Sequence, residues 1–190
     1  MVDHVKMPLN IMLAGFGGQG ILFAGKLIAY AGMIDGHEIS WLPSYGPEMR
    51  GGTANCSVSI SDEAIGSPLV TEPDVFIAMN LPSYERFIDT VRPGGVVIVD
   101  ETMVGACTLR SDVDYHPIPA TEIAENSGLK GLANVLLVGK MLAVTGFSTE
   151  ATLSVAIEKS VSAKRLDLVE LNRKAIALGA DIPDSDACRA

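Results

Sequence analysis

The chain alternates between short apolar runs and segments in which apolar residues recur every third or fourth position. The apolar run at residues 9–15 predicts a buried strand, and the helical spacing that follows predicts a helix over residues 18–33. A second short apolar run at residues 37–43 predicts a strand that stops at Pro43. Together these segments have the length expected of a β-α-β unit.

Residues 53–60, "TANCSVSI", alternate strictly between polar and apolar side chains. A period of two with one polar face predicts an antiparallel or edge strand. Further strands are predicted at 73–80, 96–100 and 115–120, with helices at 82–91, 120–126, 132–145, 149–161 and 165–178. Gly179 is predicted to cap the last helix.

This order of elements predicts a single α/β domain spanning residues 1–190. The expected architecture is a three-layer, Rossmann-like domain whose sheet is mostly parallel with one antiparallel strand. The sequence contains no internal repeat, linker or low-complexity tract that would divide it.

Composition narrows the possible partners. The formal net charge is −9 and the sequence pI is about 4.7, which argues against nucleic acid, because phosphodiester binding needs clustered cations. Cys56, Cys107 and Cys188 lie far apart without a C-x-x-C pair, so we expect no metal or iron–sulfur ligands in this chain. Three reduced thiols are typical of a cytoplasmic protein, and cytoplasmic localisation is the expectation.

The hydropathy of the chain bears on whether it contacts a membrane or a partner protein. The most apolar later run, "LANVLLVGKMLAV", is interrupted by Lys140 and is too short to cross a bilayer, so no membrane span is expected. Mean hydropathy is nevertheless +0.31, and only 19% of the residues are charged. Either an unusually buried sheet or a large partner surface would account for this apolar character.

The loop after the first predicted strand contains Gly15-x-Gly17-x-x-Gly20. In the functional interpretation, Gly15 allows a tight turn, Gly17 and Gly18 let the backbone approach a phosphate, and Gly20 lets helix and strand pack closely. The alternative is that the glycines only form a tight strand–helix junction. NAD is disfavoured because no acid ends the second strand to hold the ribose; Asp35 falls in a turn before that strand.

A second glycine-rich loop, residues 44–52, should lie at the same carboxyl edge of the sheet. Arg50 could form two hydrogen bonds to a carboxylate or phosphate, Glu48 could pair with Arg50 or with a partner's cation, and Tyr45 offers a ring with a polar tip. The alternative is a solvated Glu–Arg pair on a glycine turn. No hydrolase, Walker or zinc-protease motif is present, and no catalytic residues are predicted in this chain.

The two loops together, "GFGGQGILFAGKLIAYA" and "SYGPEMRGGTANCSVSIS", with "PDVFIAMN", "GGVVIVD" and "ANVLLVGKMLAVTG", carry a family resemblance over nearly the whole chain. The sequence resembles the gamma subunit of 2-oxoacid:ferredoxin oxidoreductases, the family that includes the pyruvate, ketoisovalerate and 2-oxoglutarate enzymes. That resemblance implies oxidative decarboxylation of a 2-oxoacid, with 2-oxoglutarate expected here, to an acyl-CoA. The electrons would pass to ferredoxin or flavodoxin.

The resemblance also implies which subunits bind the cofactors and which role this chain has. Thiamine diphosphate and Mg would be bound by alpha and beta subunits and iron–sulfur clusters by other chains such as a ferredoxin-like delta subunit. This chain would be non-catalytic and would contribute coenzyme A handling and subunit assembly, with coenzyme A as a co-substrate that is not tightly bound. The residues expected to contact the ligand are Gly15, Gly17, Gly18, Gln19 and Gly20, with Tyr45, Glu48 and Arg50 at the coenzyme or subunit surface. The alternative function is a self-sufficient NAD(P)-binding reductase or a nucleotide-sensing Rossmann protein.

Overall fold

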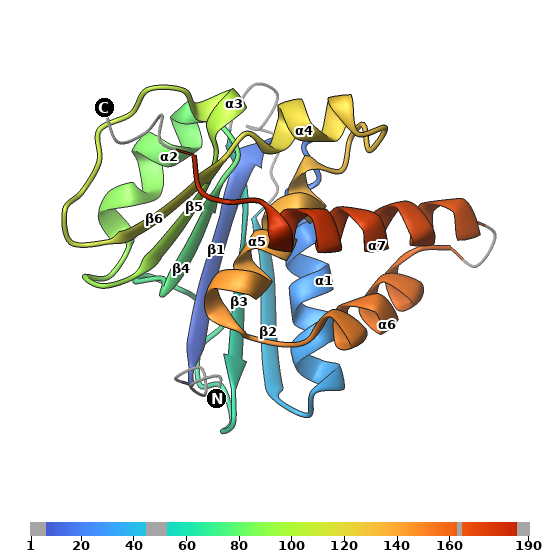
Figure 1. Ribbon diagram of the computed structural model, residues 1–190. Coiled ribbons are helices and arrows are strands. Elements are labelled where there is room, and N and C mark those ends of the chain that lie inside the picture. The colour runs from blue at the N-terminus through green and yellow to red at the C-terminus, as the bar shows by residue number, and fades with distance from the viewer. Residues whose placement is uncertain (1–6, 45–52, 163–164, 186–190) are drawn as a thin grey trace.

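A six-stranded sheet forms the centre of the molecule (Figure 1). The computed structural model describes residues 7–44, 53–162 and 165–185. The strand order is β2-β3-β1-β4-β5-β6. The strands are β1 (Leu9–Phe16), β2 (Glu38–Ser44), β3 (Thr53–Ser61), β4 (Val75–Ala78), β5 (Val96–Asp100) and β6 (Asp114–Ile118).

Strands β1, β4, β5 and β6 pair in parallel, whereas β3 runs antiparallel to both of its neighbours, β1 and β2. The strict alternation of residues 53–60 therefore correctly predicts an antiparallel strand. Its other option, an edge strand, is wrong, because β3 lies inside the sheet and the outer strand is β2. The predicted mostly parallel α/β sheet with one antiparallel strand is confirmed.

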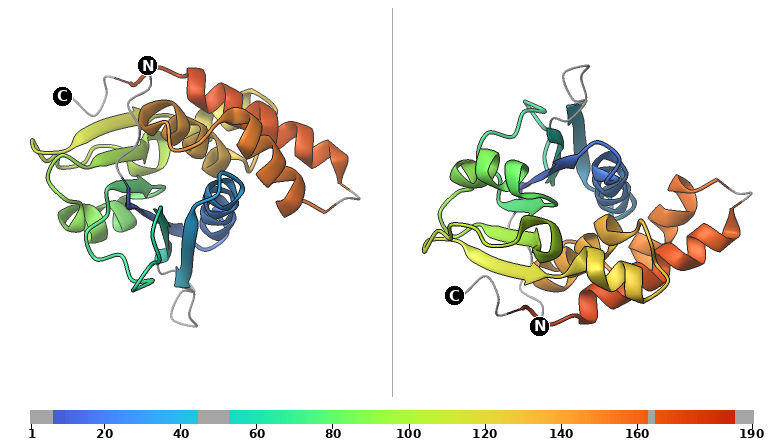
Figure 2. Two further views of the ribbon diagram at one scale, coloured as in Figure 1. Left: turned by 90° about the horizontal axis from the view of Figure 1, so that it is seen from below. Right: turned by 90° about the horizontal axis from the view of Figure 1, so that it is seen from above.

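Helices cover both faces of this sheet, which gives the expected three layers (Figures 1 and 2). On one face lie α1 (Ile21–Ile34), α5 (Ala133–Thr145), α6 (Glu150–Ser160) and α7 (Leu166–Asp181), and α4 (Ala120–Asn126) packs against α5. On the other face lie α2 (Leu81–Phe87), the 3-10 turn η2 (Ile88–Thr90) and the short helix α3 (Glu101–Val104), which the periodicity did not predict.

Each face has its own hydrophobic core. Leu27 and Ile28 of α1 and Leu136 and Leu137 of α5 are fully buried against one face of the sheet. On the other face, Tyr84 is buried together with strand residues such as Phe76 and Val99. The continuous apolar runs in β4 and β5 follow from this burial on both sides, as is typical of parallel strands.

Helices α5 and α7 cross at two glycines. A Cβ atom at Gly139 would lie 2.2 Å from the carbonyl oxygen of Ile176, and one at Gly179 would lie 2.0 Å from that of Leu136. The prediction that Gly179 caps the last helix is therefore wrong. The helix continues to Asp181, and Gly179 instead lets the two backbones approach each other.

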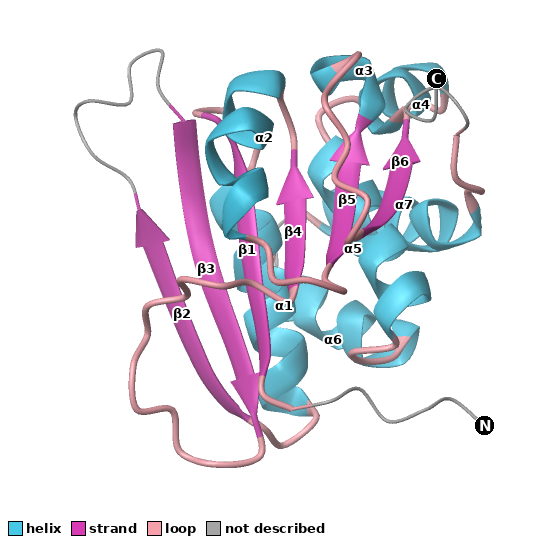
Figure 3. Ribbon diagram, turned by 90° about the vertical axis from the view of Figure 1, so that its left-hand side faces the viewer, coloured by secondary structure: helices cyan, strands magenta, loops and turns pink. Residues whose placement is uncertain are grey.

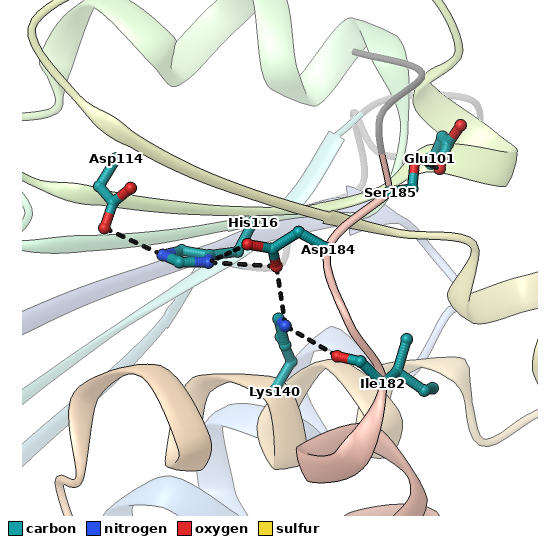
Figure 4. A network of polar contacts seen from close by, with 7 residues as sticks. All are labelled: Glu101, Asp114, His116, Lys140, Ile182, Asp184 and Ser185. Carbon is teal, nitrogen blue, oxygen red and sulfur yellow. Dashed lines mark hydrogen bonds and ion pairs between the residues drawn. The ribbon is translucent and has the colours of Figure 1, made fainter. Parts of the chain in front are cut away.

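The segment after α7, residues 182–185, is held against β6 by a polar network (Figure 4). Lys140, only 6% exposed, donates to the Ile182 carbonyl at 2.8 Å and pairs with Asp184 at 2.7 Å. His116 lies 3.0 Å from the same carboxylate, and the backbone N–H of Ser185 donates to the Pro117 carbonyl of β6. The lysine that interrupts the apolar run of α5 thus anchors this segment.

Candidate functional site

The carboxyl ends of the parallel strands meet at one edge of the sheet (Figure 3). At this edge β1 ends at Phe16 and α1 begins at Ile21, so the glycine loop lies between a strand end and a helix N-terminus. Gly18 and Gly20 have φ values of 96° and 77°, a left-handed conformation that side chains rarely adopt. The predicted position of the loop is confirmed.

The glycines of the loop divide into two that pack and two that are accessible. A Cβ atom at Gly15 would lie 2.7 Å from Cδ1 of Ile21, and one at Gly20 would lie 2.5 Å from Nδ2 of Asn134. Gly17 and Gly18 are exposed, and a Cβ atom at Gly18 would meet nothing within 4 Å. The backbone of Gly17 and Gly18 is therefore the part of the loop that a ligand can approach.

Gln19 connects the loop to the end of β4. Its Oε1 accepts a hydrogen bond from the Phe16 backbone N–H at 2.6 Å and another from Nδ2 of Asn80 at 3.0 Å. Its Nε2 donates to the Met79 carbonyl at 2.9 Å. The side-chain amide, which was predicted to contact a ligand, thus bonds within the chain across the crevice between the ends of β1 and β4.

Asn80 completes this connection and was not among the residues predicted from the sequence. It is 1% exposed, and its Oδ1 accepts from the Ser83 backbone N–H, which caps the start of α2. The signal was available, because an Asn two residues before Pro82 is typical of a helix N-terminus. Asn80 therefore both starts α2 and fixes Gln19.

Two hollows lie on either side of the glycine loop. One, of about 250 Å³, is lined by Gly17, Gly18 and Gly20 together with the apolar side chains of Phe16, Phe23 and Ala54. The other, of about 300 Å³, lies between Gly18, Gln19 and Met79 on one side and α3, α4 and the start of α5 on the other. The exposed glycine backbone is therefore bordered by two hollows that both contain apolar side chains.

The wall formed by α4 is fixed by a buried carboxylate at the end of β5. Asp100 is fully buried and accepts from the backbone N–H and the hydroxyl of Thr121, at 3.2 and 2.5 Å. Burial raises the pKa of Asp100, although the bonds from Thr121 oppose that rise. Thr121 lines the larger hollow, so Asp100 positions its wall.

Three predicted site residues, Tyr45, Glu48 and Arg50, lie outside the described residues. Asp35, considered and rejected as a ribose ligand, ends α1 at the opposite edge of the sheet from the glycine loop. Its carboxylate accepts from the hydroxyls of Ser148 and Thr152, at 2.5 and 2.8 Å, and so ties α1 to the start of α6.

In the described part of the chain, no group of three or more His, Cys, Asp or Glu side chains is arranged to hold a metal ion. None of the helices in that part combines the length and apolar character that a membrane span requires.

Comparison with known proteins gives consistent matches. The family model for pyruvate ferredoxin/flavodoxin oxidoreductase matches residues 10–182. Ketoisovalerate oxidoreductase subunit VorA of Methanothermobacter thermautotrophicus is 39% identical over 183 residues, which cover 95% of this chain but only 38% of VorA. The 2-oxoglutarate synthase subunit KorC of Methanocaldococcus jannaschii is 39% identical over 161 residues, covering 83% of this chain and 86% of KorC.

Solved structures agree with these matches. The gamma subunit of a keto/oxoacid ferredoxin oxidoreductase from Geobacter sulfurreducens superimposes with a TM-score of 0.79 at 29% identity, covering 91% of this chain and 96% of that subunit. The 2-oxoglutarate:ferredoxin oxidoreductase of Magnetococcus marinus gives a TM-score of 0.82 at 26% identity, covering 95% of this chain and 32% of that one. The chain belongs to the pyruvate ferredoxin/flavodoxin oxidoreductase family.

Proposed function

We propose that this chain is the gamma subunit of a 2-oxoacid:ferredoxin oxidoreductase and contributes coenzyme A handling and subunit assembly. The observation that carries the proposal is the match to KorC, which extends over 83% of this chain and 86% of that subunit. The oxidation of the 2-oxoacid would take place in alpha and beta subunits that bind thiamine diphosphate and Mg. Iron–sulfur clusters in a ferredoxin-like delta subunit would pass electrons to ferredoxin or flavodoxin.

The glycine loop supports the coenzyme A part of the proposal. Gly17 and Gly18 are exposed beside hollows that include both apolar side chains and backbone of the loop, and coenzyme A has both apolar and phosphate-bearing parts. The Magnetococcus enzyme that shares this fold was solved with coenzyme A and succinyl-CoA bound. Side chains at Gly17 or Gly18 would obstruct a ligand that approaches the backbone there.

The proposed substrate of the complex is 2-oxoglutarate. KorC subunits are named for 2-oxoglutarate synthase, whereas VorA and the indolepyruvate oxidoreductase subunit IorB are named for other 2-oxoacids. Since the 2-oxoacid would react in other subunits, the choice rests on the extent of the KorC match. Exposed Trp41 on the outer strand β2 supports a role in assembly, because tryptophan is enriched in protein interfaces.

The test is co-purification followed by assay. An affinity-tagged chain expressed in its native source should capture the thiamine-binding and ferredoxin-like subunits. The purified complex should form acyl-CoA from 2-oxoglutarate faster than from pyruvate, ketoisovalerate or indolepyruvate. A tagged chain that is recovered alone, or a complex that forms no acyl-CoA from any of the four, would refute the proposal.

A further inference from the structure

Asn134, the second residue of α5, connects the helical layer to the glycine loop. Its side-chain Nδ2 donates to the Gly20 carbonyl at 3.0 Å, and the two residues are 114 positions apart in the sequence. Asn134 is 3% exposed, so water competes little for this bond. The orientation of the amide follows from its partner, because the reverse orientation would place Oδ1 against the carbonyl oxygen. Asn134 therefore acts as a donor to the loop.

Gly20 is suited to this contact. Its φ of 77° and ψ of 21° are left-handed, and a Cβ atom there would lie 2.5 Å from Nδ2 of Asn134. Its carbonyl also accepts the backbone N–H of Ala24 at 3.0 Å, which is the first hydrogen bond of α1. One carbonyl thus binds donors from α1 and from α5, and the end of the loop is fixed against both helices.

The residue before Gly20 anchors the loop on its other side. Gln19 makes three hydrogen bonds to groups near the ends of β1 and β4. Gly17 and Gly18, which precede these two anchored residues, are exposed. The loop therefore has an accessible part followed directly by a part that is tied to the sheet and to α5.

The contact of Asn134 sets the spacing between the loop and α5. Gly18 and Gln19 line one side of the larger hollow, and Ala133, the first residue of α5, lines another. Asn134 does not line this hollow, but it ties the two sides together through Gly20. A shift of α5 relative to the loop would therefore change the width of the hollow beside the exposed glycines.

This arrangement leaves one polar atom of Asn134 unpaired. Its Oδ1 has no hydrogen-bond partner among the described residues, and a buried acceptor without a donor lowers stability. An apolar side chain of similar size would avoid that cost but could not donate to the Gly20 carbonyl. Stability alone thus favours an apolar residue at this position, whereas holding the loop requires a donor.

We propose that Asn134 is a positioning residue for coenzyme A, which holds Gly20 so that the backbone of Gly17 and Gly18 keeps the position in which it binds the coenzyme. This inference rests on the proposed function. A purely structural contact would change stability when it is removed and leave the affinity for coenzyme A as it was. A positioning contact changes that affinity at nearly constant stability.

The experiment compares Asn134→Leu with Asn172→Leu in the reconstituted complex. Asn172 on α7 is a matched control, because it is also 3% exposed, donates within its own helix to the Leu168 carbonyl, and has an Oδ1 without a partner among the described residues. Asn134→Leu should raise the KM for coenzyme A about three- to tenfold, and Asn172→Leu should leave it at the wild-type value. The turnover number at saturating coenzyme A and the KM for the 2-oxoacid should not change in either variant.

Two further measurements separate positioning from stability. The melting temperature of the Asn134→Leu chain should stay within about 3 °C of wild type, because the unpaired Oδ1 is removed together with the hydrogen bond to Gly20. Calorimetric titration of the complex without the 2-oxoacid should show that coenzyme A binding is weakened by the same factor as the KM. Asn134→Ala removes the amide without filling its place, and it should weaken coenzyme A binding at least as much.

An unchanged affinity for coenzyme A in both Asn134→Leu and Asn134→Ala, or an equal loss in Asn172→Leu, would overturn the inference. The proposed function would still stand in either case if the complex formed acyl-CoA at the wild-type rate. A wild-type complex that forms no acyl-CoA would refute the proposed function and this inference with it.

Discussion

Gln19 is predicted to stabilise the domain by joining two strand ends rather than by touching a ligand. Its amide makes three hydrogen bonds, to the Phe16 N–H, the Asn80 amide and the Met79 carbonyl. Gln19→Ala would remove all three and leave these partly buried groups to water. At about 1 kcal/mol for each neutral bond, the free energy of unfolding should fall by roughly 2–3 kcal/mol.

Gln19→Glu tests the same hydrogen bonds through the dependence of stability on pH. A carboxylate can still accept from Phe16 and Asn80, but it cannot donate to the Met79 carbonyl and instead places two acceptors in contact. The folded state should therefore favour the protonated acid and raise its pKa above the unfolded value of about 4.3. The neutral acid can donate, so the loss of stability should be smallest at low pH and grow as pH rises through the folded pKa.

The assay is urea denaturation of the purified chain at pH 5.5 and pH 8, with Gln19→Asn as a control that keeps the amide but shortens its reach. We expect Gln19→Asn to resemble Gln19→Ala, and Gln19→Glu to lose more stability at pH 8 than at pH 5.5. Wild-type stability in Gln19→Ala, combined with a weakened affinity of the complex for coenzyme A, would refute this reasoning and return Gln19 to ligand contact.

Three other outcomes can be checked. Gly179→Ala should lower the free energy of unfolding by more than about 3 kcal/mol or prevent folding, because its Cβ meets a backbone carbonyl of α5. Gly66 has open space around it, so Gly66→Ala should change the free energy of unfolding by less than about 0.5 kcal/mol, as measured by thermal melts. Burial opposes ionisation of Asp184, but Lys140 and His116 hold its pKa below the ordinary value. Asp184→Asn should therefore cost about 1–2 kcal/mol at pH 7, and the cost should vanish as pH falls through that lowered pKa; an equal cost at all pH values would contradict it. Calorimetric titration of the isolated chain with NAD or NADP should give no binding, and micromolar affinity would restore the self-sufficient reductase.

Periodicity predicted most elements because each strand and helix buries a defined face. The continuous apolar runs around Ile77 and Ile98 became strands buried on both sides, and the alternation around Cys56 became an antiparallel strand. The glycine loop was also placed correctly, because a strand end, glycines and a helical pattern follow one another in sequence. These features are local, and local spacing is sufficient to specify them.

The remaining features depend on contacts between distant segments. Gly179 has the appearance of a helix cap until α5 is seen to cross α7 at that point. Gln19 and Asn80 are separated by 61 residues, and Lys140 bonds to a segment 42 residues away, so no window of sequence could pair them. The larger hollow beside the glycine loop likewise depends on the packing of α5 there.

The position of β3 argues against dinucleotide binding at the glycine loop. In that class the second strand of the β-α-β unit lies beside the first, and an acid at its end reaches the ribose of a nucleotide bound at the glycine loop. Here β3 lies between β1 and β2, so β2 is displaced from β1 by two strand spacings, roughly 10 Å. An acid at the end of β2 would be too far away, and Asp35 instead ties α1 to α6 at the opposite edge. Since Gln19 also bonds between the ends of β1 and β4, the glycine loop keeps an exposed backbone but lacks the contacts that a dinucleotide requires. Its accessible surface is therefore suited to a ligand that extends outward from the edge, as the proposed coenzyme A would.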